Sequence, residues 1–244
     1  MRFSICIPSL NEEKYIDKLL TCLTRQTFKD FEVIVSDGKS EDKTKDIVLS
    51  FKDKLDIKFI ESPERGVSFQ RNYAAKNSEG EYIIFFDADV QISDIFLEKI
   101  DEFLEEKNVD VLTSWNKPLS NRADDKFLFF LTNVLCLELI KRTAPGAVGV
   151  FICVRRSSFE KVGGFKENIS FAEDYELVRR LHRNSFKYAL LKKPPIEVSV
   201  RRLEKEGRLH MVGKTLKAGV YYLLCGEGFA EKLKGKIVHE SGKF

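Results

Sequence analysis

Short runs of β-branched and aromatic residues alternate with longer amphipathic patterns through the first half of the chain, and this alternation constrains the fold most. The β-rich runs are Phe3 to Ile7, Phe31 to Val35, Ile57 to Ile60 and Tyr82 to Phe86. Strands separated by helices form βαβ units, which build a mainly parallel sheet with helices on its faces. The sequence therefore predicts an α/β fold with a Rossmann-like central sheet.

Two helices in this half are predicted from apolar periodicity. The residues that share one face of the first helix are Ile16, Leu19, Leu20 and Leu23. Ser9-x-x-Glu12, just ahead of them, is similar to a capping box. Ser93 is predicted to cap the second helix, whose apolar face consists of Leu97, Ile100 and Leu104.

The second half breaks this alternation. Strands are predicted at Val109 to Thr113, near Val148 to Val154, at Lys187 to Leu191 and, after Pro194-Pro195, at Ile196 to Val200. A helix is predicted at Glu173 to Arg183. Because no linker interrupts the chain, we expect two halves that share one sheet, residues 1–114 and 115–200, followed by a basic helical tail, 201–244.

Composition limits the classes of function. Lysine and arginine (41) nearly balance aspartate and glutamate (38), and a net charge of +3 excludes a general nucleic-acid binder. The five cysteines are scattered without a C-x-x-C pair, so we expect buried free thiols at Cys6, Cys22, Cys136, Cys153 and Cys225.

Two segments bear on location. The first residues form too short an apolar run for a signal peptide, so a cytoplasmic location is the expectation. The apolar segment from Phe127 to Ile140 covers only about 14 residues, whereas a spanning helix needs roughly 20. It is therefore either a buried helix or a segment that lies in a membrane interface.

Two carboxylates follow a buried strand. Ile83 to Phe86 run directly into Asp87-Ala88-Asp89, and open α/β sheets bind their ligands at the carboxyl ends of their strands. Two carboxylates at this place suit an oxygen-seeking cation, Mn²⁺ or Mg²⁺, whose shell substrate phosphates would complete. A D-x-D pair alone is also compatible with a solvated turn or a helix cap, so its context decides.

The context is an ordered series of motifs. They are Ile7-Pro8-Ser9-Leu10-Asn11-Glu12-Glu13, Val35-Ser36-Asp37-Gly38-Lys39-Ser40, Arg71-Asn72, Asp87-Ala88-Asp89, Gly163-Gly164-Phe165 and Ala172-Glu173-Asp174-Tyr175-Glu176-Leu177. In this order they resemble the signature of family 2 glycosyltransferases, over roughly residues 1 to 200. The resemblance implies a GT-A fold and a nucleotide-diphosphate sugar as donor. Ser36 stands where that family commonly has a second acidic residue, which leaves the base of the nucleotide open.

The resemblance also implies roles for individual residues. The base and ribose of the donor would lie near Pro8, Asn11, Glu12, Asp37 and Arg71. Asp87 and Asp89 would hold the metal and the diphosphate. Taken alone, Asp37-Gly38 is equally compatible with a plain turn and Arg71 with a surface charge.

Asp174 matches the general base of the inverting members of the family. It would accept the proton of an acceptor hydroxyl that attacks the anomeric carbon, with inversion of configuration. The alternative is structural, because carboxylates are favoured at the start of a helix by its dipole.

The tail beyond residue 200 is basic and amphipathic from Arg208 to Leu224. It is interpreted as a docked helix, as a lid whose Arg201 or Arg202 contacts the diphosphate, or as an interfacial helix near anionic lipid. With the segment at Phe127 it leaves peripheral membrane contact and a lipid-linked acceptor open. His210 is a further alternative contact for metal or phosphate.

Two other functions compete with glycosyl transfer. A sugar nucleotidylyltransferase also combines an α/β nucleotide fold with metal-binding aspartates, but it carries a glycine-rich phosphate segment that Pro8 to Glu12 lacks. The other is a non-catalytic module that binds nucleotide sugars without turnover, and the presence of Asp87, Asp89 and Asp174 argues against it.

Overall fold

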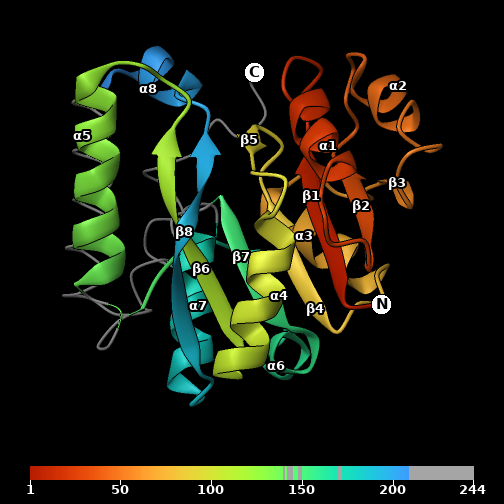
Figure 1. Cartoon of the computed structure of the whole chain (residues 1–244). Helices are drawn as coiled ribbons and strands as arrows, with labels where there is room; N and C mark the ends of the chain where they lie inside the picture. The colour runs from red at the N-terminus through yellow and green to blue at the C-terminus, as the bar shows by residue number, and fades with distance from the viewer. Residues whose placement is uncertain (140, 142–144, 148–149, 170–171, 209–244) are drawn as a thin grey trace.

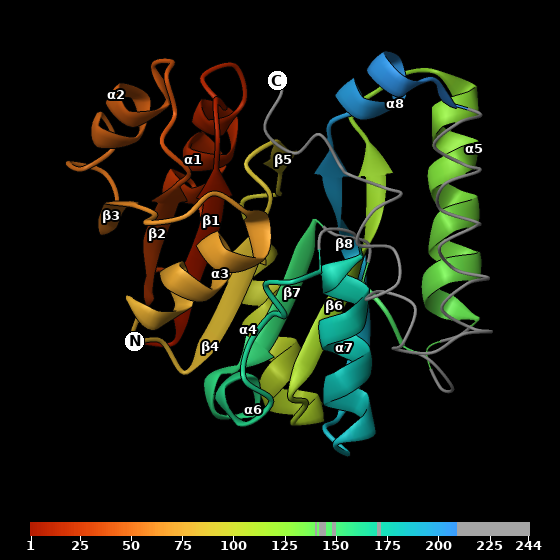
Figure 2. The ribbon, with the colours of Figure 1, turned by 180° about the vertical axis from the view of Figure 1, so that it is seen from behind.

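The computed structural model describes residues 1–139, 141, 145–147, 150–169 and 172–208, which form one mixed sheet with helices on both faces (Figures 1 and 2). The strands are β1 Phe3–Ser9, β2 Phe31–Asp37, β3 Ile57–Glu61, β4 Tyr82–Phe86, β5 Val90–Gln91, β6 Val111–Pro118, β7 Phe151–Arg155 and β8 Tyr188–Val198. The helices are α1 Ile16–Thr24, α2 Thr44–Leu49, α3 Val67–Lys76, α4 Phe96–Lys107, α5 Ala123–Thr132, the π-helix η1 Asn133–Glu138, α6 Arg156–Lys161, α7 Glu173–Arg183 and α8 Arg201–Glu206.

The strand order is β3-β2-β1-β4-β7-β6-β8-β5. β1 to β4 pair in parallel, β7 runs antiparallel to both of its neighbours, β6 and β8 are parallel, and β5 is antiparallel to β8. The parallel half is the part that the alternating pattern predicted. Both halves share one sheet, as expected.

Two apolar layers cover the sheet. On one face, buried side chains of α1, α2 and α4 pack against β1, β2 and β4, and on the other face α3, α6 and α7 do so (Figures 1 and 2). Cys6, Cys22 and Cys153 are buried free thiols as predicted, Cys136 is half-buried, and Cys225 lies outside the described residues. None of the helices among the described residues is long and apolar enough to cross a bilayer.

Both predicted helix caps are wrong. α1 begins only at Ile16, and the hydroxyl of Ser9 instead donates a hydrogen bond of 2.9 Å to Asp37 on the neighbouring strand. α4 begins at Phe96 without a side-chain cap, and Ser93 contributes only its carbonyl oxygen to the first turn. In both places the chain makes an extra turn before the helix begins.

The two strands predicted around Pro194-Pro195 are one strand, β8. It pairs with β6 from Tyr188 to Leu191 and again from Ile196 to Val198, with a register shift in between. Prolines lack the N–H group that a central ladder needs. The register shift between β6 and β8 accommodates the two prolines, so β8 continues as one strand.

The described part of the predicted apolar segment, residues 127–139, is not a buried helix, and Ile140 lies outside the described residues. The described part belongs to α5 and η1, which stand beside β6 and leave Phe127 and Phe130 exposed. Of the predicted amphipathic helix from Arg208 to Leu224, all residues after Arg208 lie outside the described residues, as does His210.

Candidate functional site

The site lies where parallel strands end. β1 ends at Ser9 and β2 at Asp37, which are direct partners in register, and β4 ends one residue before Asp87. Pro8 lies in β1 opposite Ser36. The first-half motifs therefore meet at the upper edge of the sheet in Figure 1, as the position of D-x-D predicted.

Asp37 organises the loop that follows β2. One carboxylate oxygen accepts the hydroxyls of Ser9 (2.9 Å) and Ser40 (2.6 Å), and the other accepts the backbone N–H of Ser40 (2.7 Å). Asn11, at a left-handed φ of 54°, donates its backbone N–H to Ser40 and accepts that of Glu41 on its side chain. These bonds tie the β1 and β2 loops together, so Asp37 forms the turn considered above; its predicted contact with the donor stays a prediction.

Arg71 joins the two halves of the chain. Its guanidinium is 3% exposed, and it donates hydrogen bonds of 2.8 Å to Asp87 and 2.9 Å to Glu173, at the start of α7. Burial lowers the pKa of Arg71, but the charges of Asp87, Glu173 and Asp174 outweigh burial and raise it. Its guanidinium also lies 5.2 Å from the ring centre of Phe165. Arg71 is therefore no surface charge.

Asn72, the next residue, holds the glycine-rich turn of the second half. Its amide nitrogen donates to the carbonyl oxygen of Phe165 (2.9 Å), and its amide oxygen accepts the N–H of Phe165 (2.8 Å). A Cβ atom at Gly164 would lie 2.6 Å from that amide oxygen, and Gly164 has a φ of 69°. The Arg71-Asn72 and Gly163-Gly164-Phe165 motifs thus form one contact between α3 and the segment that precedes α7.

Asp174 is 7% exposed and lies in the first turn of α7. The helix follows Ala172, which has a left-handed φ of 57° and makes no side-chain cap. Asp174 is therefore not the N-cap residue, although the helix dipole still favours a carboxylate there. Its electrostatic coupling to Arg71 places it on the same buried network as Asp87.

A second arginine bridges the other site carboxylates. β5 pairs with the end of β8, so Asp89 lies close to the start of α8, where Arg201 begins the helix. The Arg201 guanidinium contacts both oxygens of Glu12 at 2.7 Å and Asp89 at 2.8 Å, and it covers the ring of Tyr15 at 4.5 Å. The sequence analysis named Arg201 and Glu12 as separate candidate residues. The structure shows that they form an ion pair, although they are 189 residues apart in the sequence.

The electrostatics of this cluster follow from burial. Burial raises the pKa of Glu12 and of Asp89, repulsion from Asp87 adds to the effect, and Arg201 opposes it in both cases. Burial would lower the pKa of Arg201, but Glu12 and Asp89 raise it. The carboxylates of Glu12, Asp87 and Asp89 therefore lie close together. The positive charges of Arg71 and Arg201 offset their negative charges.

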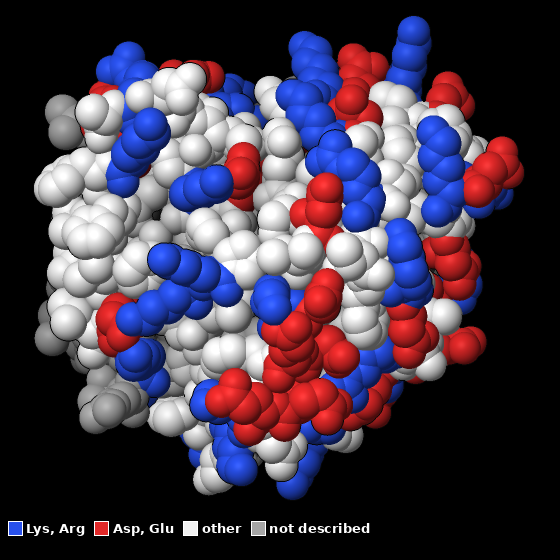
Figure 3. Space-filling view, viewed as in Figure 1, with Lys and Arg blue, Asp and Glu red and all other residues white. Residues whose placement is uncertain are grey.

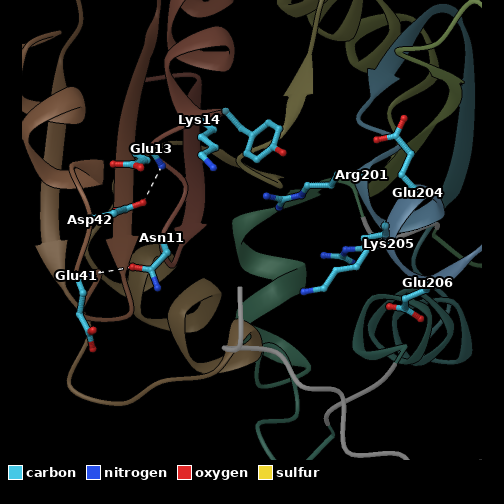
Figure 4. Close-up of a pocket in the computed structure, with 11 residues that line it drawn as sticks. Asn11, Glu13, Lys14, Glu41, Asp42, Arg201, Glu204, Lys205 and Glu206 are labelled. Carbon is cyan, nitrogen blue, oxygen red and sulfur yellow. Dashed lines mark hydrogen bonds between the residues drawn. The ribbon is translucent and has the colours of Figure 1, made fainter.

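A cavity of about 740 Å³ opens beside this cluster (Figure 4). In Figure 4 one wall comes from the loops after β1 and β2, and the opposite wall comes from α8. Its lining residues are Asn11, Glu13, Lys14, Tyr15, Glu41, Asp42, Arg201, Arg202, Glu204, Lys205 and Glu206. Its volume is within the usual range of small-molecule and cofactor sites.

The structure brings most of the predicted site residues together. Pro8, Asn11, Glu12 and Asp37 lie at the ends of β1 and β2, Asp87 and Asp89 follow β4, Asp174 joins them through Arg71, and Arg201 and Arg202 line the cavity. Sequence reasoning missed the roles of Glu173, Asn72 and Tyr15. The Glu173-Asp174 pair was a signal for the first of these, but only the structure shows that Glu173 binds Arg71.

Asp87 and Asp89 fit the predicted metal site only if ligands from a bound molecule complete it. Among the described residues, no group of three or more histidine, cysteine, aspartate or glutamate side chains could hold a metal ion. Asp87 and Asp89 have hard oxygen ligands that suit Mn²⁺ or Mg²⁺, but each carboxylate contacts an arginine. They fit a half-site whose remaining ligands come from a bound phosphate compound.

Comparison with known proteins finds relatives that agree on one family. The model of glycosyl transferase family 2 matches residues 4–163. The poly(ribitol-phosphate) beta-N-acetylglucosaminyltransferase TarS of Staphylococcus aureus is 30% identical over 199 residues, which are 78% of this chain and 34% of TarS. Glycosyltransferase AglE of Haloferax volcanii is 29% identical over 72% of this chain and 60% of AglE. This chain thus spans about a third of the length of TarS.

Solved structures agree with the fold. S. aureus TarS in complex with UDP-GlcNAc matches 82% of this chain and 59% of the TarS chain, with 29% identity and a TM-score of 0.69. A mannosyltransferase of Pyrobaculum calidifontis, solved with GDP-Man and Mn²⁺, matches 96% of this chain and 72% of its own, with 21% identity and a TM-score of 0.72. The predicted GT-A fold is confirmed.

Proposed function

Since the chain belongs to glycosyl transferase family 2, we propose that it transfers a sugar from a nucleotide-diphosphate sugar to an acceptor hydroxyl, with inversion. The observation that carries the proposal is the ion pair network of Arg71. It joins Asp87, on the donor side, to the first turn of α7, which holds Asp174. A donor carboxylate and a candidate base thus belong to one buried unit.

We assign the donor to residues 1–114 and the acceptor to residues 115–200. Pro8, Asn11, Glu12 and Asp37 would surround the base and ribose beside the cavity. The diphosphate would lie toward Asp87, with Arg201 and Arg202 of the tail segment 201–244 close to its negative charge. TarS was solved with UDP-GlcNAc, and this supports a UDP-sugar as the first donor to test.

The transfer itself needs a base. Asp174 would accept the proton of the acceptor hydroxyl while that oxygen forms a bond to the anomeric carbon. The bond from this carbon to the diphosphate breaks on the opposite face, and its electron pair leaves with the nucleoside diphosphate. A single displacement of this kind inverts the anomeric carbon.

The growing charge on the leaving group needs stabilisation. Asp87 and Asp89 would hold Mn²⁺ or Mg²⁺ together with the donor, and the ion would supply positive charge at the diphosphate. Arg201 contributes positive charge from the same side, since its guanidinium already lies against Asp89. Arg71 stays beneath Asp87 and keeps its carboxylate in place.

The acceptor is proposed by class. TarS is named for a poly(ribitol-phosphate) acceptor, and a glucosyltransferase of Bacillus spizizenii that is 35% identical over 54% of this chain carries the same acceptor name. We propose a glycan or polyol polymer that presents free hydroxyls.

A direct assay distinguishes the competing functions. The protein is incubated with UDP-, GDP- and dTDP-sugars, with and without Mn²⁺, and the released nucleotide is identified. Release of nucleoside diphosphate supports glycosyl transfer. In a parallel incubation with a sugar phosphate and a nucleoside triphosphate, release of pyrophosphate indicates a nucleotidylyltransferase. Nucleotide binding without turnover on any acceptor indicates a binding module.

Two variants test the assigned roles. Asp174→Asn should abolish transfer while donor affinity stays within a few-fold of the wild type, because the amide cannot accept a proton. Asp89→Ala should remove the dependence of donor binding on Mn²⁺. Asp94→Asn is the control, since Asp94 is half exposed and pairs only with Arg25 among the described residues. Normal transfer by Asp89→Ala without a divalent cation would contradict the metal site.

A further inference from the structure

The segment formed by α5 and η1 presents an apolar face to solvent. Among the described residues, three of the six exposed large hydrophobic side chains belong to this segment, Phe127 (66% exposed), Phe130 (54%) and Leu135 (37%), and a fourth, Leu139 (66%), directly follows it. A π turn advances more slowly around the axis than an α turn, so Leu135 of η1 and the following Leu139 stay near the face of the phenylalanines, whereas Leu137 is buried. An apolar face of this kind on the surface marks an interaction site.

The inner side of the same segment carries two buried polar residues beside the buried Leu137. Asp125 is fully buried and is bound by Ser120 and Arg208, and Asn133 exchanges two hydrogen bonds with the backbone of Asn116. A helix on the surface of a soluble domain normally buries its apolar side and exposes its polar side. α5 and η1 depart from this arrangement, since Asp125 and Asn133 are buried together with Leu137 and the outward side carries exposed phenylalanines.

The surroundings of this face are aromatic and basic. Trp115 packs edge-on against Phe130, with 6.5 Å between ring centres, and the ammonium group of Lys192 lies 5.5 Å from the centre of the indole ring. Lys126 and Lys193 are exposed as well. In Figure 3 the left side of the molecule, over α5, is largely uncharged, and lysine and arginine side chains stand beside it. Tryptophan and lysine at the edge of an apolar face are typical of proteins at a bilayer surface.

The nearby acidic groups do not cancel this charge. Glu138 pairs with both Lys141 and Lys192, and Asp124 pairs with Arg122. The rim of the face is therefore net basic, which favours an anionic partner over a neutral one.

We propose that α5 and η1 form a docking surface for an anionic lipid bilayer. Phe127, Phe130 and the two leucines would enter the boundary between headgroups and acyl chains, and the lysines would lie at the level of the lipid phosphates. This inference goes beyond the proposed sugar transfer and does not depend on it. It would bring the acceptor side of the domain to a membrane without a spanning helix.

The test uses the full chain and sedimentation with vesicles. Wild-type protein should bind vesicles of phosphatidylcholine and phosphatidylglycerol in equal parts at least tenfold more tightly than pure phosphatidylcholine vesicles. The double variant Phe127→Ser, Phe130→Ser should lose at least tenfold in affinity for the mixed vesicles. Ile95→Ser is the matched control, since Ile95 is 43% exposed outside this segment, and it should bind as the wild type does.

Several results would overturn the proposal. Absence of wild-type binding to mixed vesicles contradicts it directly, and equal binding by the double variant assigns lipid affinity to another part of the chain. A wild type that dimerises in sedimentation velocity, with a monomeric double variant and no vesicle binding, makes the face a contact between copies. A fall in Tm of the double variant, again without vesicle binding by the wild type, means that the chain itself covers the face.

Discussion

Replacement of Arg71 by methionine tests the link between the two halves most sharply. Methionine keeps much of the length and the apolar stem of arginine but removes the positive charge. Asp87 and Glu173 would then remain as neighbouring carboxylates that are only 17% and 13% exposed. Removal of one partner from a buried ion pair leaves an uncompensated charge and costs about 3–5 kcal/mol.

The partial exposure of the two carboxylates favours the lower end, about 3 kcal/mol. For a domain of this size each kcal/mol lowers Tm by about 2–4 °C, so Arg71→Met should melt about 6–12 °C below the wild type. Arg25→Met is the control, because Arg25 is 55% exposed and pairs at 3.1 Å with Asp94, which is 54% exposed. Exposed pairs contribute about 0–1 kcal/mol.

Urea unfolding followed by circular dichroism measures both variants, and initial rates measure transfer. Arg71→Lys should recover part of the stability, but one ammonium group cannot reproduce two hydrogen bonds from a planar fork. Its kcat should therefore fall more than its affinity for the donor changes. Equal loss of stability in Arg71→Met and Arg25→Met would refute the link.

Further predictions concern the core and the second arginine. Burial raises the pKa of Glu32, but hydrogen bonds from its neighbours lower it below 4.5, so Glu32→Gln should be destabilised at pH 7, with a deficit that shrinks as the pH falls through the acid range in urea titrations. Gly80→Ala would place a methyl group 2.5 Å from a backbone nitrogen of β1, and unfolding should show a loss of about 1–3 kcal/mol. Arg201→Met should raise the pKa of Glu12 and Asp89 further, because their cation is lost. Ionised carboxylates with raised pKa values destabilise the fold, so its deficit in Tm should be larger at pH 7 than at pH 5, and equal deficits would contradict this.

Elements with a strong local pattern were predicted well. β4 and α7 have the same limits in the structure as in the sequence prediction, because a continuous apolar run and a helical period are properties of adjacent residues. The caps were wrong for the opposite reason. The hydroxyl of Ser9 binds Asp37, 28 residues away, and the pairing of β1 with β2 creates that contact.

In the candidate site, too, features set by adjacent residues could be predicted, and contacts between residues far apart in the sequence could not. Asp87 and Asp89 could be placed from the strand before them, since the end of a buried strand is visible in the sequence. Their partners could not, because Arg71 and Glu173 are 102 residues apart and Arg201 and Glu12 are 189 apart. Only the order of strands in the sheet brings such residues together.

The two arginines differ in what they can do when a donor arrives. Arg71 is 3% exposed and is held from two sides by Asp87 and Glu173, so it acts as a fixed part of the site. Arg201 is 17% exposed, begins a short helix and lines the open cavity. If the proposed cation binds Asp89, it would compete with Arg201, and the negative charge of a diphosphate would offer the guanidinium a new partner in exchange. Under the proposed function the site would thus have one permanent counter-charge, Arg71, and one that the donor can redirect, Arg201, and the two arginines together offset the buried carboxylates of Glu12, Asp87 and Asp89.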